Sequence, residues 1–178
     1  SPQFEPGLVS IVIPNWNGKH FLADCLDSLL KQTYTNIEII VVDNSSSDNS
    51  SEFILSMYPD VILIEAGKNL GFASGCNLGI KKSRGEYIVL LNNDTVVDTN
   101  WLKELVAVVD GDDDIAIAGS KLLYKHNPNE IQNAMSYLTD KGDGGDMGSH
   151  QPDEGQYDST REVMAVCGAS MLIKRSLM

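Results

Sequence analysis

The segment LVSIVIPNWN, residues 8–17, decides the fold. Its first six residues form a short apolar run rich in β-branched side chains that stops at Pro14, which predicts a buried strand. Apolar runs of the same kind return three times, and segments with helix-compatible patterns lie between them. The expected strands cover residues 8–13, 37–42, 61–64 and 87–91, and the expected helices cover 20–32, 48–57 and 73–83. This alternation predicts an α/β fold in which helices cover both faces of a parallel sheet.

The second half of the chain carries weaker signals. A helix is expected at 100–109, short strands at 115–119 and 163–167, and a further element beginning in 169–175. Residues 126–160 are rich in Gly, Asp, Asn and Pro and have almost no periodicity, which predicts a long flexible loop facing a substrate. We expect a single domain over residues 1–178, with this loop as part of it.

Composition excludes several classes of protein. The chain of 178 residues has 13 Lys plus Arg against 25 Asp plus Glu, and its formal charge of −12 argues against a nucleic-acid partner. Three distant cysteines suggest neither a disulfide framework nor a zinc site, which fits a reducing compartment. No apolar run approaches the roughly 18 residues of a membrane span, and no signal-peptide pattern is present. We therefore expect a soluble cytoplasmic protein. The sequence has no P-loop, no nucleophile elbow and no H-E-x-x-H motif. These absences disfavour, in turn, a nucleotide hydrolase, a serine hydrolase and a zinc enzyme.

Short polar side chains follow each of the first four expected strands. In open parallel sheets, ligands bind beyond the carboxyl ends of the strands, so these positions are the candidate site. The side chains are of kinds that bind a ribose, a base edge or a cation. They lie in residues 14–18 after the first strand, 43–45 after the second, 69–72 after the third and 92–94 after the fourth.

Two of these strand ends have alternative interpretations. Asp94 could hold Mg²⁺ or Mn²⁺ together with substrate phosphates, whereas Asn92 to Thr95 could equally form an Asx turn that needs no metal. Asp43 or Asn44 could accept the imide N–H of a uracil or thymine ring, or this segment could only cap the following helix. The residues alone leave both pairs of interpretations open.

Five segments together resemble the family 2 glycosyltransferases of GT-A fold, particularly their rhamnosyltransferase-like branch. The segments are VSIVIPNWN (9–17), IVVDNSS (40–46), NLGFASGCNLG (69–79), GEYIVLLNNDT (85–95) and CGASMLIKR (167–175). The resemblance implies a Rossmann-like GT-A sheet and metal-assisted, inverting transfer of a sugar from a UDP- or dTDP-sugar to a hydroxyl of a glycan or lipid-linked acceptor. It also implies a role in polysaccharide biosynthesis, in the cytoplasm or at the inner face of the membrane.

The resemblance also implies a set of site residues. Asp94 occupies the last position of the family's D-x-D motif and would bind Mg²⁺ or Mn²⁺, while Asn92 stands where the family has Asp and would contact the ribose or sugar. The other residues implied to bind the nucleotide sugar fall into three groups. They are Pro14, Asn15, Asn17, Asp43 and Asn44 around the nucleoside; Asn69, Gly71 and Asn77 in the loop closing over the nucleotide; and Gly168 and Ala169 in the segment that lines the donor sugar and the acceptor cleft. Asn93, the middle residue of the D-x-D position, is also expected to bind the nucleotide sugar.

The resemblance leaves the general base unassigned. In relatives the base belongs to an acidic pair some way after the segment matching 167–175, so we expect it beyond Met178. The chain, which begins with Ser1, is then expected to be the donor-binding part of a longer enzyme, truncated at its C-terminus, that transfers poorly. A base within the chain would come from Asp153, Glu154 or Asp158.

Two other functions are weighed against sugar transfer. A noncatalytic sugar-nucleotide-binding or interaction module is the alternative, because the base is missing and Asn92 replaces a carboxylate. A nucleotidyltransferase would need a Gly-rich loop with basic residues after the first strand, which residues 15–18 do not supply.

Overall fold

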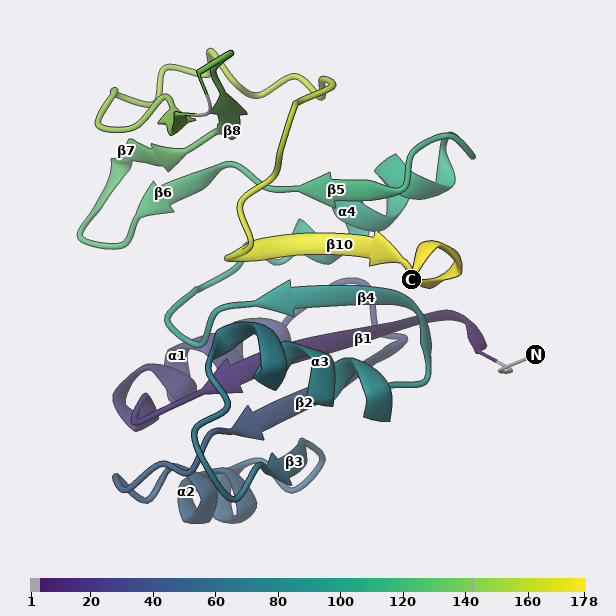
Figure 1. Ribbon diagram of the computed structural model, residues 1–178, viewed down its shortest axis with the longest axis vertical. Helices are drawn as coiled ribbons and strands as arrows, with labels where there is room; N and C mark the ends of the chain where they lie inside the picture. The colour runs from purple at the N-terminus through teal and green to yellow at the C-terminus, as the bar shows by residue number, and fades with distance from the viewer. Residues whose placement is uncertain (1–3, 142) are drawn as a thin grey trace.

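A six-stranded sheet forms the centre of the computed structural model, which describes residues 4–141 and 143–178 (Figure 1). Its strand order is β3-β2-β1-β4-β10-β5. The strands are β1 (Glu5–Asn15), β2 (Ile37–Asp43), β3 (Ile62–Glu65), β4 (Gly85–Leu91), β5 (Ile117–Gly119) and β10 (Ser170–Lys174). Strands β3, β2, β1 and β4 pair in parallel, whereas β10 is antiparallel to both β4 and β5. The mostly parallel sheet is confirmed, with β10 as its exception.

The first strand continues past the position at which the sequence predicted its end. Pro14 pairs in register with Val42 of β2, and Asn15 pairs with Asp43. The carbonyl of Asn15 accepts a hydrogen bond from Asn44 on the β2 side, so Pro14 faces the β4 side. Because the pairing of β1 with β4 ends at Val12, the missing N–H of Pro14 costs the sheet no hydrogen bond.

Helices cover both faces of the sheet, as the alternation predicted. The helices α1 (Lys19–Leu29), α2 (Ser50–Met57) and α4 (Trp101–Asp110) share one core, and α3 (Phe72–Lys82) packs in the core on the opposite face. Figure 1 shows α3 in front of the sheet and α1 and α4 behind it. Close packing of α3 requires Gly79, because a Cβ there would overlap Val12 and lie 3.1 Å from Val42.

The path of the chain creates a switch point between β1 and β4. From β1 the chain passes through α1 to β2 and through α2 to β3, moving outward on one side of β1. It then crosses through α3 to β4, on the other side of β1. In doubly wound sheets, ligands bind in the crevice at such a reversal, outside the carboxyl ends of the strands. The site is therefore expected beyond Asn15 and Leu91.

Residues 122–147, most of which belong to the stretch 126–160, contain strands that the sequence did not predict. The strands β6 (Leu122–Tyr124) and β7 (Asn127–Asn133) form one antiparallel hairpin, and β8 (Met135–Leu138) and β9 (Gly144–Met147) form another. These strands give no periodic signal in the sequence, because a two-stranded ribbon with little burial needs no alternation of apolar and polar residues. The prediction of irregular structure throughout 126–160 was therefore wrong, while its flexibility stays a prediction.

The prediction of a strand at 163–167 was also wrong. This segment makes only an isolated antiparallel bridge, between Ala165 and Ser136. Ser136 belongs to β8, so the segment contacts the edge of the β8–β9 ribbon at this one point, and it lies across a hollow from β5. The chain ends in β10 and the 3₁₀ helix η1 (Arg175–Leu177).

None of the helices within the described residues is long and apolar enough to cross a bilayer. The longest of them, α1 and α3, have 11 residues each, about half of what a membrane span requires.

Candidate functional site

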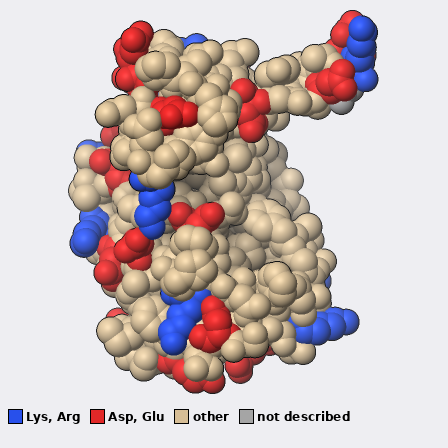
Figure 2. All heavy atoms as spheres, turned by 90° about the vertical axis from the view of Figure 1, so that its left-hand side faces the viewer, with Lys and Arg blue, Asp and Glu red and all other residues tan. Residues whose placement is uncertain are grey.

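The carboxyl ends of β1, β2 and β4 lie at one edge of the sheet, on the left in Figure 1. Figure 2 looks onto this edge and shows acidic and basic side chains scattered among uncharged ones. Polar residues from three of the four strand ends that the sequence singled out meet here.

A buried hydrogen-bond network joins the ends of β1 and β2. Asn15 is 1% exposed and Asp43 is 3% exposed. Asn15 Nδ2 donates to Asp43 Oδ1 at 3.0 Å, and Ser46 donates to the same carboxylate through its backbone N–H at 2.9 Å and its hydroxyl at 2.5 Å. A buried carboxylate is stable only when its oxygens are hydrogen-bonded, so this network holds Asp43 in one orientation.

The same asparagine connects this network to the loop after β4. Asn15 Oδ1 accepts a hydrogen bond from Asn93 Nδ2 at 2.8 Å. The amide of Asn15 therefore uses one end for Asp43 and the other for Asn93, across the switch point between β1 and β4. Asn17 contributes to the same region, because its backbone N–H donates to Ser46 Oγ at 2.9 Å and its Oδ1 accepts from the Ser47 N–H at 2.8 Å.

Gly18 provides the space for the bond between Asn15 and Asn93. A Cβ on residue 18 would overlap the amide nitrogen of Asn93 and lie 2.6 Å from Asn15 Oδ1. We expect Gly18→Ala to lower the free energy of unfolding by about 1–3 kcal/mol, because the two amides must separate. Thermal denaturation checks this, with Gly168→Ala as the control, because a Cβ there meets nothing within 4 Å. Equal melting temperatures for the two variants would contradict the prediction.

The loop before α3 is tied to the end of β2 by Asn44. This residue is 3% exposed, and its Oδ1 accepts from the Leu70 N–H at 3.4 Å. Asn69 Oδ1 accepts from the Gly71 N–H at 2.8 Å, and Gly71 has a φ of +75°, which favours glycine. Asn69 and Gly71 are exposed at the rim. Asn77 is exposed on α3, and no hydrogen bond within the described residues joins its side chain to the Asn15 network.

Asp48 caps the helix that follows β2, which was the alternative interpretation of the segment after the second strand. Its Oδ2 accepts from the Lys19 N–H at 2.9 Å and its Oδ1 from the Ser50 N–H at 3.1 Å, so it satisfies the first turns of both α1 and α2. Burial alone would raise the pKa of the Asp48 carboxyl, but the hydrogen bonds from Ser50 and Lys19 outweigh burial and lower it. Asp48 is therefore the residue that caps the two helices, whereas the Asp43 carboxylate links β1, β2 and Ser46 through hydrogen bonds.

The turn after β4 presents Asp94 to solvent. The Thr95 N–H donates to the Asn92 carbonyl at 3.3 Å, so residues 92–95 form a backbone turn, and the Asp94 side chain is exposed. The Asn92 N–H donates to the Ala169 carbonyl at 3.0 Å, which places Gly168 and Ala169 beside this turn. The turn at residues 92–95 therefore does not exclude a metal-binding role, because it leaves the Asp94 carboxylate exposed. Within the described residues, no group of three His, Cys, Asp or Glu side chains is placed to hold a metal by itself.

Helix α1 supports this turn from behind. The Cys25 thiol lies 3.8 Å from the Asn92 carbonyl, Ser28 Oγ accepts from the Val97 N–H at 3.2 Å, and Gln32 Nε2 donates to the Asp98 carbonyl at 2.7 Å. Burial, together with the negative charge of Asp94, raises the pKa of Cys25 to about 12, and the positive charge of Lys125 opposes this rise. Cys25 is therefore a neutral thiol in contact with the loop that carries Asp94.

A small polar hollow of about 290 Å³ lies at the ends of β2 and β3. Its lining includes Asp43, which the sequence predicted, and Ser46, Glu52 and Glu65, which it did not. Glu65 is the last residue of β3, so the rule that ligands bind at strand ends could have found it. The exposed Trp16 follows Asn15 at the end of β1.

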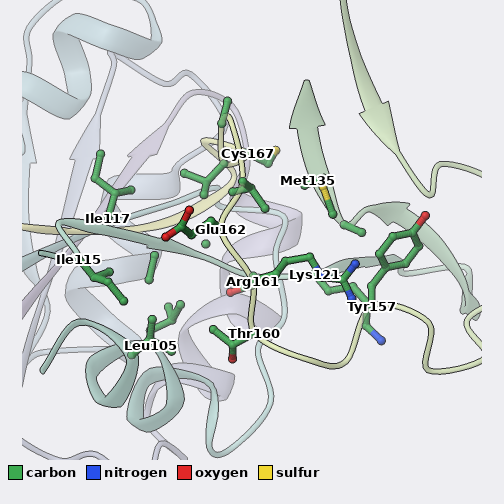
Figure 3. Close-up of a pocket in the computed structure, with 18 of the residues that line it drawn as sticks. Leu105, Ile115, Ile117, Lys121, Met135, Tyr157, Thr160, Arg161, Glu162 and Cys167 are labelled. Carbon is green, nitrogen blue, oxygen red and sulfur yellow. The ribbon is translucent and has the colours of Figure 1, made fainter. Parts of the chain in front are cut away.

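A larger hollow of about 770 Å³ runs along the outer edge of β5 (Figure 3). Leu105, Ile115 and Ile117 line one side, and Arg161 and Glu162 come from the segment opposite. Cys167 also lines this hollow, next to Gly168. The hollow lies beyond β10, on the far side of the sheet from Asp43, and most of its lining comes from residues that the strand-end argument did not select. The polar crevice, where the parallel strands reverse their order, is therefore the candidate site.

Comparison with solved structures identifies the class of fold. The sheet matches GT-A glycosyltransferase structures: a mannosyltransferase from Pyrobaculum calidifontis in complex with GDP-Man and Mn²⁺ superposes with a TM-score of 0.65 at 17% identity, over 95% of this chain and 45% of that one. S. aureus TarS 1–349 in complex with UDP superposes with a TM-score of 0.59 at 22% identity, over 64% of this chain and 35% of that one. The predicted GT-A fold is therefore confirmed.

Comparison of sequences then identifies the family. Residues 10–178 match the model of glycosyl transferase family 2, and the chain belongs to this family. Glycosyltransferase GlyG of Streptococcus pneumoniae serotype 4 is 36% identical over 121 residues, and an uncharacterized glycosyltransferase of Rickettsia felis is 38% identical over 120 residues. These matches cover 66% and 65% of this chain, but only 40% and 20% of the respective relatives. The chain thus spans less than half of the length of either relative.

Proposed function

We propose that this chain is the donor-binding domain of an inverting glycosyltransferase that moves a sugar from a UDP- or dTDP-sugar to an acceptor hydroxyl. The observation that carries the proposal is the buried network of Asn15, Asp43 and Ser46, which Asn93 links to the exposed turn of Asp94. Membership of family 2 supports transfer, and S. aureus TarS, which has the same fold, forms complexes with UDP and with UDP-GlcNAc.

The nucleoside is proposed to lie against the end of β2. Asp43 Oδ2 accepts one hydrogen bond within the protein, from the Ser46 N–H, and a carboxylate oxygen can accept two. Asp43 lines the small hollow, and the remaining lone pair of Oδ2 would accept the imide N–H that uracil and thymine share. Guanine has a differently shaped hydrogen-bonding edge and a larger ring. Trp16, 58% exposed beside Asn15, offers an aromatic face on which a base would stack.

The residues of the Asp94 turn fit a divalent cation. Mg²⁺ and Mn²⁺ are hard ions that proteins bind through one or two carboxylates plus substrate phosphates, and the exposed Asp94 is one such carboxylate. When bound, the cation would neutralise charge on the leaving diphosphate. Asn92, beside Ala169, would hydrogen-bond the ribose or the donor sugar, and Asn93 would keep the turn joined to Asn15.

Asp153 and Asp158, two of the three carboxylates expected as possible general bases within the chain, make weak candidates. Lys121 Nζ lies 2.7 Å from Asp153 Oδ2 and 2.5 Å from Asp158 Oδ1. The hydrogen bond from Lys121 lowers the pKa of Asp153, and a carboxylate of lower pKa is a poorer proton acceptor. We therefore propose that the residues of this chain bind the donor and that efficient transfer needs a base from elsewhere.

Nucleotide binding tests the proposal directly. We expect UDP or dTDP to raise the melting temperature of the chain more with Mn²⁺ than with EDTA, and GDP to have little effect. A ligand at 100 times its Kd stabilises the folded state by about 2.7 kcal/mol, which corresponds to roughly 5–10 °C for a domain of this size. Differential scanning fluorimetry checks this. The proposal fails if neither UDP nor dTDP shifts the transition at millimolar concentration.

A further inference from the structure

The turn between β6 and β7 reaches back to α1 through an exposed ion pair. Lys125 Nζ lies 2.7 Å from Asp24 Oδ2, although 101 residues separate the two in sequence. Figure 1 shows this turn on the same side of the molecule as the carboxyl ends of β1, β2 and β4. The ion pair therefore holds the β6–β7 hairpin at the edge of the sheet where the donor is proposed to bind.

Lys125 lies near the turn that carries Asp94. Its partner Asp24 is adjacent to Cys25, whose thiol is 3.8 Å from the carbonyl of Asn92, two residues before Asp94. The negative charge of Asp94 raises the pKa of this thiol, and the positive charge of Lys125 lowers it. The Lys125–Asp24 pair thus lies on the helix that supports the turn of Asp94, where the diphosphate is proposed to bind.

The ion pair is of a kind that breaks easily. The side chains of Lys125 and Asp24 are 56% and 60% exposed, and exposed pairs of this type contribute little to stability. Lys121, by comparison, contacts two carboxylates and is only 21% exposed, so it is not free to move. A diphosphate carries more negative charge than a carboxylate and offers more acceptor oxygens. Lys125 therefore has a stronger partner available when a nucleotide is bound.

We propose that Lys125 exchanges Asp24 for the diphosphate of the bound donor and thereby closes the β6–β7 hairpin over it. The inference rests on the proposed function, because it requires a nucleotide in the crevice. It supplies a cation from the protein itself to a chain of formal charge −12. In this scheme Asp24 keeps Lys125 near the site before the donor arrives.

Two matched variants test the exchange. Lys125→Met removes the ammonium, and Asp24→Asn removes its resting partner while leaving Lys125 free. We expect Lys125→Met to weaken UDP binding about tenfold, as for a hydrogen bond to a charged group, and to leave uridine binding unchanged. Asp24→Asn should leave UDP affinity equal to or higher than that of the wild type, and Lys125→Arg should retain it. Calorimetric titration with UDP and NMR titration with uridine, both with Mn²⁺ present, measure these affinities.

The alternative roles of the pair give different results. If the pair were only a clasp for the hairpin, both variants would change UDP affinity to the same extent, and the inference would be overturned. It would also be overturned if Lys125→Met bound UDP as tightly as the wild type, or lost uridine affinity to the same degree. Failure of the wild-type chain to bind either UDP or uridine would instead reject the proposed function, and the exchange with it.

Discussion

Replacement of Asp94 by Ala is expected to abolish the effect of Mn²⁺ on nucleotide binding. In wild-type protein we expect Mn²⁺ to tighten UDP binding on the order of 100-fold, because the ion couples the only carboxylate of the 92–95 turn to the diphosphate. In the variant, UDP affinity should be the same with Mn²⁺ and with EDTA. The loss corresponds to about 2.7 kcal/mol of binding free energy. Calorimetric titration of UDP in both buffers measures it.

The fold should survive this change, because the Asp94 side chain is exposed. Asp60→Asn is a suitable control: it removes one exposed carboxylate from the turn before β3, at the opposite edge of the sheet, and should retain the full Mn²⁺ effect. A Mn²⁺ effect that persisted in Asp94→Ala would show that the ion is held by other residues. The assignment of Asp94 as a metal ligand would then be wrong, even if UDP still bound.

The central strands were predictable because burial on both faces gives them a nearly continuous apolar sequence, interrupted only by Ser10 in β1 and Glu38 in β2. The runs in β1, β2 and β4 carry this signal, and their order along the chain implies a parallel sheet. The direction of β10 was not predictable, because its short apolar run of Met171, Leu172 and Ile173 would look the same in a parallel and in an antiparallel strand. The hairpins of β6 to β9 were missed because their stability comes mainly from backbone pairing, which leaves no periodicity in the sequence.

The candidate site was predictable in outline and not in its contacts. The rule for strand ends selects Asn15, Asp43 and Asn93 without any knowledge of the structure. It does not reveal that Asn15 bonds to both of the others, or that Gly18 leaves room for one of these bonds. These contacts join residues 28 and 78 positions apart, and no local pattern encodes such a pairing. The approach of Lys125 to Asp24 is of the same kind.

Replacement of Asp43 by Asn should reduce both stability and nucleotide affinity. The carboxylate accepts from Asn15 Nδ2 and from the N–H and hydroxyl of Ser46, and an amide at position 43 would turn an NH₂ group toward at least one of these donors. An unsatisfied buried polar group costs about 1–3 kcal/mol, so we expect the free energy of unfolding to fall by about 2 kcal/mol and the melting temperature by roughly 4–8 °C. The loss of a charged acceptor for the imide should weaken UDP binding at least about tenfold.

Asp48→Asn separates the two effects. Asp48 is also a carboxylate that accepts hydrogen bonds within the protein, from backbone N–H groups in the first turns of α1 and α2. Unlike Asp43, it does not line the hollow at the end of β2. Its replacement should lower the melting temperature in the same way and leave UDP affinity, measured below both transitions, at the wild-type value. If Asp48→Asn weakened UDP binding as much as Asp43→Asn, the loss would reflect a loosened crevice in general. Asp43 would then hold β1 and β2 together without recognising the base.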